Sequence, residues 1–367
     1  NMRRDPRYGA LDNEAVRRAG GEIPFEVPGA SLSFRTILFE SLATSVQPHV
    51  QVPDVGEFHR YHNYAVRTLG PLLALSSNSP FLPGDCYDLP HAEVTDPETL
   101  VKRTHHELRV AAFEGSMNQG CRKVRVPDDL DAPADAVEDV VADDTFAPFL
   151  REWLDDDGDG DAGGGEDADG GEAADPWEFD YKRGTFWRWV RGVPGGDAVD
   201  GACDEQSLRI EYRPLPTQPT VRDTVGIQVL TAGLLRGLVA TDHPLLELPW
   251  EAAERSFYDA VEHGFYAEPE WVTADGGRTR DPDAVFAEVF TLARHGLDVQ
   301  GVSPAVRDRY LSPVAARWDE GVTPSVWKKR RVLTHLEDGR SLTEALAAMQ
   351  REYVDLSREH ETFVDWL

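Results

Sequence analysis

The chain has 367 residues, of which 37 are Lys or Arg and 66 are Asp or Glu, so its formal net charge at pH 7 is −29. This charge repels the phosphates of nucleic acid and argues against a nucleic-acid-binding protein. Only five of the 37 basic residues are Lys, and excess acid with Arg in place of Lys is typical of a cytoplasm rich in salt, where ions screen the self-repulsion.

Hydrophobic residues make up 41% of the chain, which predicts a globular protein with a substantial core. Cys86, Cys121 and Cys203 are scattered, which disfavours a disulfide framework or a zinc site and suits a reducing compartment. No leader-like segment opens the chain, and no apolar run approaches about 18 residues. We therefore expect a cytoplasmic protein without a membrane partner.

The first third of the chain predicts strands followed by a helix. Residues 30–52 are strand-like, most clearly at 32–35 and 45–52. In the second of these strands Gln47, His49 and Gln51 share one face, since side chains alternate along a strand. Apolar residues at helical spacing predict a helix over about 55–75, which the Gly70-Pro71 pair is expected to kink.

The middle of the chain is acidic. Residues 128–144 are loop-like, and a short amphipathic helix is predicted from Phe146 to Leu154. Residues 155–176 are almost only Asp, Glu, Gly and Ala, which indicates a low-complexity insertion, mobile and dispensable. This insertion satisfies an EF-hand pattern and a Gly-x-Gly-x-x-Gly pattern, but in so biased a composition both arise by chance, and we interpret neither as a site.

Two further strands are predicted at 186–191 and 208–213. In the second, alternation places Arg209, Glu211 and Arg213 on one face, opposite Leu208, Ile210 and Tyr212. A carboxylate between guanidiniums stays ionised and can hold a metal, and arginines bind phosphate or carboxylate oxygens in a bidentate way. The same alternation also fits a surface ion-pair ladder, so this strand alone does not decide between the two.

The rest of the chain predicts helices, at about 221–240, 250–264, 281–296, 303–318, 323–337 and 341–357. Strands first and helices last indicate an α+β fold, with helices covering a mostly antiparallel sheet. We expect a single domain over residues 1–367, with the insertion at 155–176 and a helical C-terminal part over 245–367.

Three segments, in this order, resemble the type-2 glutamate–cysteine ligases, a branch of the carboxylate–amine ligases. They are His49-Val50-Gln51, the run Leu75-Ser76-Ser77-Asn78-Ser79-Pro80-Phe81, and Ile210-Glu211-Tyr212-Arg213. The family shows a His-x-His strand, a Leu-Ser-x-Asn-Ser-Pro-Phe loop and an (Ile/Leu)-Glu-x-Arg strand. The Trp-rich segment that ends at Arg191 extends the likeness. The resemblance implies the glutamate–cysteine ligase and glutamine synthetase type of catalytic fold, with an open active-site face on its sheet.

The activity implied by the resemblance is ATP-dependent joining of the γ-carboxylate of glutamate to the amine of cysteine, through an acyl phosphate and with Mg²⁺ or Mn²⁺. Glu211 and Arg213 would be catalytic, Glu211 as a metal ligand and Arg213 as a clamp on the transferring phosphoryl group. The same resemblance assigns His49 to metal or nucleotide binding with Gln51 and Arg209, and the substrates to Arg191, Trp189, Asn78 and Ser79. If these assignments hold, the Glu211 carboxylate should lie within about 7 Å of His49 or Gln51.

Two departures from the family bear on activity. Gln51 stands where the family has a second histidine, and no glutamate-bearing first strand is found. We therefore expect that about a quarter of the enzyme precedes this chain, and that the chain alone folds poorly, has no ligase activity and leaves the Glu211 strand with an unpaired neighbour.

Other interpretations stay open. A ligase of the same fold for another acid and amine, or a non-catalytic relative with a binding or structural role, fits the same motifs. The sequence is also compatible with a homo-oligomer. His59, His62 and the run His105-His106-Glu107 lack the spacing of a metal site and are interpreted as surface or capping residues.

Overall fold

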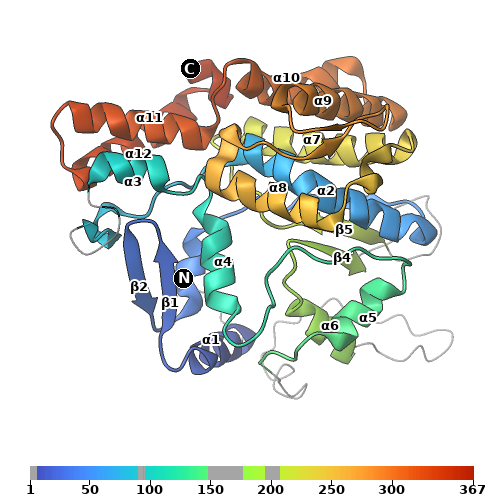
Figure 1. The fold of residues 1–367 in the computed structure, drawn as a ribbon, viewed down its shortest axis with the longest axis horizontal. Helices are drawn as coiled ribbons and strands as arrows, with labels where there is room; N and C mark the ends of the chain where they lie inside the picture. Colours follow the sequence, from blue (N-terminus) through green and yellow to red (C-terminus); the bar gives the residue numbers. More distant parts are fainter. Residues whose placement is uncertain (1–5, 90–93, 95, 148–176, 195–206) are drawn as a thin grey trace.

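The computed structural model describes residues 6–89, 94, 96–147, 177–194 and 207–367 (Figure 1). The acidic insertion predicted at 155–176 lies outside the described residues, as does most of the helix predicted from Phe146. The two described residues of that predicted helix, Phe146 and Ala147, are not helical.

A three-stranded antiparallel sheet forms the centre of the fold. Its strand order is β3 (His49–Val52), β5 (Leu208–Tyr212) and β4 (Val190–Pro194). The register aligns His49, Glu211 and Arg191 in one row across the sheet. β5 is the middle strand and is paired on both sides, while among the described residues its neighbours β3 and β4 pair with β5 alone, so the Glu211 strand does have neighbours with an unpaired edge, as expected.

The apolar face of this sheet lies against α2 (Phe58–Ser76). The hydroxyl of Tyr212 on β5 is 2.9 Å from the Thr68 hydroxyl of α2, inside the core. A Cβ atom at Gly192 of β4 would come within 2.7 Å of the Phe58 ring, so a glycine is needed for this close approach. The opposite face of the sheet therefore carries the charged side chains, as the alternation predicts.

Helices are stacked in layers beyond α2, at the top of Figure 1. The helix α8 (Trp250–His263) packs on α2, while α7 (Val221–Ala240) packs against α2, α9 (Pro282–Val299) and α10 (Pro304–Asp319). By length and composition alone α7 could cross a membrane, and 56% of its apolar window is buried inside this protein. Its position between other helices is that of a core helix.

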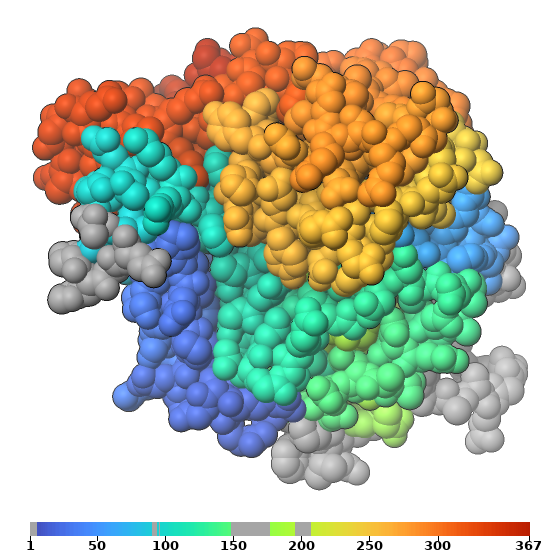
Figure 2. Space-filling model, viewed as in Figure 1, coloured from blue at the N-terminus to red at the C-terminus, as the bar shows by residue number. Residues whose placement is uncertain are grey.

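A second, smaller hydrophobic core lies under the C-terminal helices. It joins α11 (Pro324–Glu337) and α12 (Leu342–Glu359) to α3 (Pro97–Arg103), whose Leu100 and Val101 are buried there. These C-terminal helices, orange-red to red, lie at the upper left of the face seen in Figure 2.

The N-terminal part forms an arm beside the central sheet. It contains α1 (Pro6–Arg18) and a hairpin of β1 (Ile23–Val27) and β2 (Ala30–Phe34), with α4 (Leu108–Met117) packed on the hairpin. A 3₁₀ turn, η1 (Ile37–Leu42), follows the hairpin within the stretch where strands were predicted, so the sequence-based assignment is wrong there.

The helices predicted from 221 onward are all present, with ends that differ by a few residues. The structure corrects three other expectations. Residues 128–144 contain the helix α5 (Asp135–Ala142), whose Asp135 and Glu138 suit the positive end of a helix dipole. A small hairpin, β6 (Trp271–Val272) and β7 (Arg278–Thr279), interrupts the helical part. The strands form three small sheets among the described residues rather than one large sheet.

Candidate functional site

The candidate site is centred on Glu211, in the middle of the charged face of the sheet. Its side chain is only 3% exposed, because cationic neighbours cover it. One carboxylate oxygen accepts a hydrogen bond from Nε of Arg191 on β4. The other oxygen lies 3.7 Å from Nε of Arg213 and 3.8 Å from Nε2 of His49. The expected proximity of Glu211 to His49 is therefore confirmed.

The electrostatics keep Glu211 ionised. Burial by itself would raise the pKa of the Glu211 carboxyl, but the charges of Arg191 and Arg213 outweigh it and leave the pKa below its usual value. Burial lowers the pKa of His49, and Arg209 and Arg191 add to that effect against the opposing charge of Glu211. At neutral pH the site therefore presents an anionic oxygen next to an uncharged imidazole, both able to bind a metal.

Arg213 supplies a buried cation at the end of the same strand. Its backbone N–H donates to the carbonyl of Trp189 at 2.9 Å, and its Nη1 donates to the carbonyl of Arg188 at 3.4 Å. Burial lowers the pKa of Arg213 to about 9, an effect that Glu211 opposes, so the guanidinium is still charged at neutral pH. The other two residues of the predicted nucleotide group, Gln51 and Arg209, face each other one row further along the sheet.

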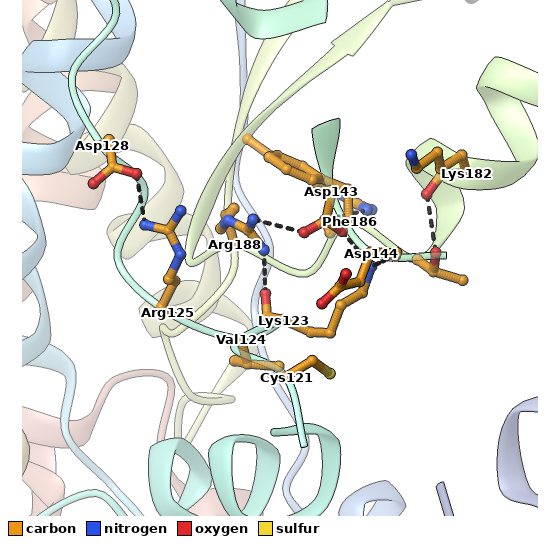
Figure 3. Close-up of polar contacts among 12 residues, drawn as sticks. Cys121, Lys123, Val124, Arg125, Asp128, Asp143, Asp144, Lys182, Phe186 and Arg188 are labelled. Carbon is orange, nitrogen blue, oxygen red and sulfur yellow. Dashed lines mark hydrogen bonds and ion pairs between the residues drawn. The ribbon is translucent and has the colours of Figure 1, made fainter. Parts of the chain in front are cut away.

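A buried ion cluster holds the Trp-rich segment that leads into β4 (Figure 3). Lys123 and Arg188 both pair with the carboxylate of Asp143, and Arg188 also donates to the carbonyl of Lys123. The backbone N–H of Trp189 donates to the carbonyl of Arg125 at 2.9 Å. These contacts fix the segment just before Arg191, and so help to place Arg191 opposite Glu211.

Trp189, assigned to substrate binding by the resemblance, lies in the core and is 1% exposed. Its indole Nε1 donates to the carboxylate of Glu114 at 2.8 Å, and the Tyr258 hydroxyl donates to the same oxygen at 2.8 Å. In this structure Trp189 packs against Phe113 of α4 and Phe257 of α8, and its contact with a substrate stays a prediction.

Asn78 and Ser79 form the turn that follows α2. Their backbone N–H groups donate to one oxygen of Glu107, at 3.0 and 3.2 Å. The Asn78 side-chain amide donates to the carbonyl of Thr217 and to the hydroxyl of Tyr353, at 2.7 and 2.8 Å. The segment after α2 is thus tightly bonded, and its contact with a substrate stays a prediction.

Several charged residues near Arg213 were missed by sequence reasoning. Arg109 donates to the Arg213 carbonyl, and Glu40 is 8% exposed and accepts a hydrogen bond from Ser116. Burial raises the pKa of Glu40 to about 8, although Arg109 and Arg213 oppose this. The only sequence feature that could have drawn attention to Arg109 was the His-His-Glu run at 105–107, which lies two residues before it.

That run was interpreted as surface or capping residues. The capping part is confirmed, because Glu107 accepts from the backbone N–H of Arg109 at the start of α4. The surface part is wrong for Glu107, His106 and His62, which are all buried. Burial lowers the pKa of His62 to about 4 and of His106 to about 3, so both rings are neutral inside the fold.

The metal-binding capacity of the site rests on few residues. Among the residues that the structure describes, no group of three His, Cys, Asp or Glu side chains could hold a metal ion. Mg²⁺ is commonly held by one or two carboxylates plus substrate phosphates. The ionised Glu211 is the kind of donor that Mg²⁺ and Mn²⁺ prefer. Metal binding by Glu211 and His49 stays a prediction.

The comparison with protein families decides what kind of protein this site belongs to. The family model of glutamate-cysteine ligase family 2 matches residues 1–358. The chain belongs to this family. Membership of glutamate-cysteine ligase family 2 indicates a ligase that joins a carboxylate to an amine. No curated protein matches the chain significantly.

Proposed function

We propose that this member of glutamate-cysteine ligase family 2 uses ATP to join the γ-carboxylate of glutamate to the amine of cysteine through an acyl phosphate. The observation that carries the proposal is the row His49–Glu211–Arg191 across the sheet, with Arg213 beside it. In a chain with a net charge of −29, a face where guanidiniums gather is matched to anionic substrates.

Each group of the site has a role in this proposal. The Arg213 guanidinium would stabilise the charge on the phosphoryl group as it moves from ATP to the glutamate carboxylate. Arg191 would orient a substrate carboxylate, while Gln51 and Arg209, which pair with each other two residues further along β3 and β5, would contact the nucleotide. Glu211, with His49, would hold Mg²⁺ or Mn²⁺, whose charge offsets that of the phosphates when bound.

Support for these roles comes from the geometry of the charges. A buried carboxylate between two guanidiniums is costly to keep for stability alone, because each desolvated charge loses several kcal/mol of hydration, on the order of the ion pair's own attraction. His49 is 35% exposed at the edge of the group, so the cluster is open to solvent on the His49 side. We also propose small-molecule substrates and the glutamate–cysteine ligase type of catalytic fold, which family membership supports, and a cytoplasmic location, which the scattered cysteines support.

The test is a coupled assay of ADP release by the full-length protein in molar KCl. Glutamate is supplied with each amino acid in turn, with Mg²⁺, with Mn²⁺ or with a chelator, and products are identified by mass. We expect metal-dependent ADP release with glutamate and cysteine. Release only with another acid and amine would replace these substrates, and no release with any pair would favour a non-catalytic relative.

A further inference from the structure

The two charged residues at the start of α4, Glu107 and Arg109, contact both the turn after α2 and the end of β5. We propose that Arg109 and Glu107 are positioning residues, through which Arg213 and the Asn78–Ser79 turn are held in one fixed arrangement. The inference rests on the proposed function, because it gives Arg109 a role that acts through Arg213.

Arg109 holds the backbone of Arg213 from one side. Its Nε and Nη2 both donate to the Arg213 carbonyl, at 3.3 and 3.2 Å, and its Nη1 donates to the carbonyl of Ala43. On the other side, the Arg213 N–H donates to Trp189. The backbone N–H and carbonyl of Arg213 are thereby both hydrogen-bonded. These bonds fix the position of its Cα atom, and so the point from which its side chain extends.

The same guanidinium ties two strands of the site together. Ala43 lies in the segment that leads to β3. The residue after it, Thr44, accepts a hydrogen bond at its carbonyl from the backbone N–H of Thr217, which follows β5. Val46 in turn donates to the carbonyl of Leu215 at 2.9 Å. Arg109 therefore bridges the approach to the His49 strand and the exit of the Glu211 strand, which requires a planar fork with several donors.

Glu107 fixes the other end of this arrangement. It is fully buried, at 0% exposure, and accepts from Arg109 N at 3.1 Å with one oxygen. Its second oxygen accepts from both backbone N–H groups of the Asn78–Ser79 turn. Burial lowers the pKa of Arg109, and the neighbouring Glu107 opposes that effect.

The experiment compares Arg109→Lys, Arg213→Lys and the double variant in the full-length protein. Lys keeps the charge at 109 but reaches only one of the two carbonyls. We expect Arg109→Lys to lower kcat about 10-fold with the KM for ATP changed less than about 3-fold, because the loss is in the transition state. The kcat of the double variant should lie within about 2-fold of that of Arg213→Lys, because residue 109 acts through residue 213.

The matched control is Arg67→Lys. Arg67 is equally buried and also donates to a backbone carbonyl, that of Leu248, but it lies on α2 and pairs with Asp129. It should lose stability and keep kcat. The proposal would be overturned if the fold-losses of kcat in Arg109→Lys and Arg213→Lys multiplied in the double variant. It would also be overturned if Arg67→Lys lost as much kcat as Arg109→Lys.

Amide hydrogen exchange separates this inference from the proposed function. In Arg109→Lys the backbone amides of Tyr212 and Arg213 should exchange at least about 10-fold faster, while Arg67→Lys leaves them unchanged. Should Arg109→Lys not fold, Glu107→Gln, which keeps one acceptor oxygen, should accelerate exchange at Asn78 and Ser79. Unchanged exchange in both variants would overturn the inference even in an active enzyme. A wild type without ADP release would defeat only the proposed function.

Discussion

At the scale of single residues, Glu211 and Arg213 are held by a dense set of charges on a face that also exposes His49. The sequence pattern fitted both a surface ion-pair ladder and a site. A surface ladder would have exposed partners, whereas Glu211 is 3% and Arg213 is 8% exposed. Ion pairs between exposed side chains contribute only about 0–1 kcal/mol to stability. Such a ladder does not require burial, so the burial of Glu211 and Arg213 favours a site.

The first prediction concerns Arg213. Arg213→Lys should lower turnover about 10²-fold or more, because a point charge cannot reproduce the bidentate fork on the phosphoryl oxygens. Turnover is measured by ADP release in the full-length enzyme. Arg125→Lys serves as the control, since Arg125 pairs with the exposed Asp128. Unchanged turnover would assign Arg213 to a structural ion pair.

Three of the five lysines of this chain are buried. They are Lys123, Lys328 and Lys329, and each donates to a backbone carbonyl, those of Asp144, Asn78 and Thr104 respectively. A compact ammonium on a thin stem can reach a carbonyl inside the core where a planar guanidinium does not fit. A salt-adapted surface would account for the small number of Lys residues, a proposal that the fourth prediction tests, and these three buried Lys residues each bond a backbone carbonyl.

The second prediction is a dependence of stability on pH. Because the pKa of Glu40 is raised to about 8 in the folded protein, the folded state holds its proton over a range where the unfolded chain has lost it. Stability from this group is present below about pH 4.5 and is lost as the pH rises toward about 8. Glu40→Gln should flatten the fall of the unfolding midpoint between pH 5 and pH 8, by thermal or denaturant unfolding. An equal fall in Glu40→Gln and wild type would rule out Glu40 as its source.

At the scale of elements, the helical layer depends on a close crossing of α7 and α9. A Cβ atom at Gly296 would lie 1.9 Å from the carbonyl oxygen of Gly233, and one at Gly237 would lie 2.1 Å from that of Leu292. Backbones therefore touch at this crossing, and no side chain larger than hydrogen fits there. The crossing holds α7 against α2, which lies directly on the sheet of the site.

The third prediction tests that crossing. Gly296→Ala should destabilise the protein by about 3 kcal/mol, since overpacking of a tight core forces backbones apart. The matched control is Gly9→Ala in α1, where an added Cβ meets nothing within 4 Å. That change should be neutral or stabilising by about 0.5–1 kcal/mol, because Ala is the better helix former. Denaturant unfolding of both variants measures the difference, and equal midpoints would refute the close crossing.

At the scale of the whole molecule, a net charge of −29 sets how the fold responds to salt. Like charges spread over the surface repel one another and weaken the compact state. Ions shorten the range of that repulsion, with a Debye length of about 10 Å at 0.1 M and about 3 Å at 1 M. The buried pairs, such as Arg317 with Asp223 at 0% exposure each, are screened much less.

The fourth prediction follows from this difference. Raising KCl from about 0.1 M to about 2 M should raise the midpoint of thermal unfolding, because screening acts on surface repulsion more than on buried pairs. Sorbitol at the same osmolality, which carries no charge, is the control and should raise it less. A midpoint that stays flat or falls with KCl would contradict a salt-adapted surface.

The sequence by itself determined the parts that depend on local pattern. Alternation along β5 placed Arg209, Glu211 and Arg213 on one face, and helical spacing located α7 to α12 within a few residues. Three short motifs in order were sufficient to indicate the family that the family model matches. These features need no knowledge of distant partners, since periodicities of 2 and 3.6 are properties of the backbone alone.

The tertiary structure alone decided which distant groups meet. Three features depend on how the chain folds back on itself. β5 lies between β3 and β4, Trp189 is buried, and Arg109 donates to the carbonyl of Arg213, which is 104 residues away. Acidic composition also concealed α5, because charge favours loops in general while the first turn of a helix attracts acidic side chains. Contacts between segments far apart in sequence leave no periodic signal, so the positioning of Arg213 could be found only in the folded molecule.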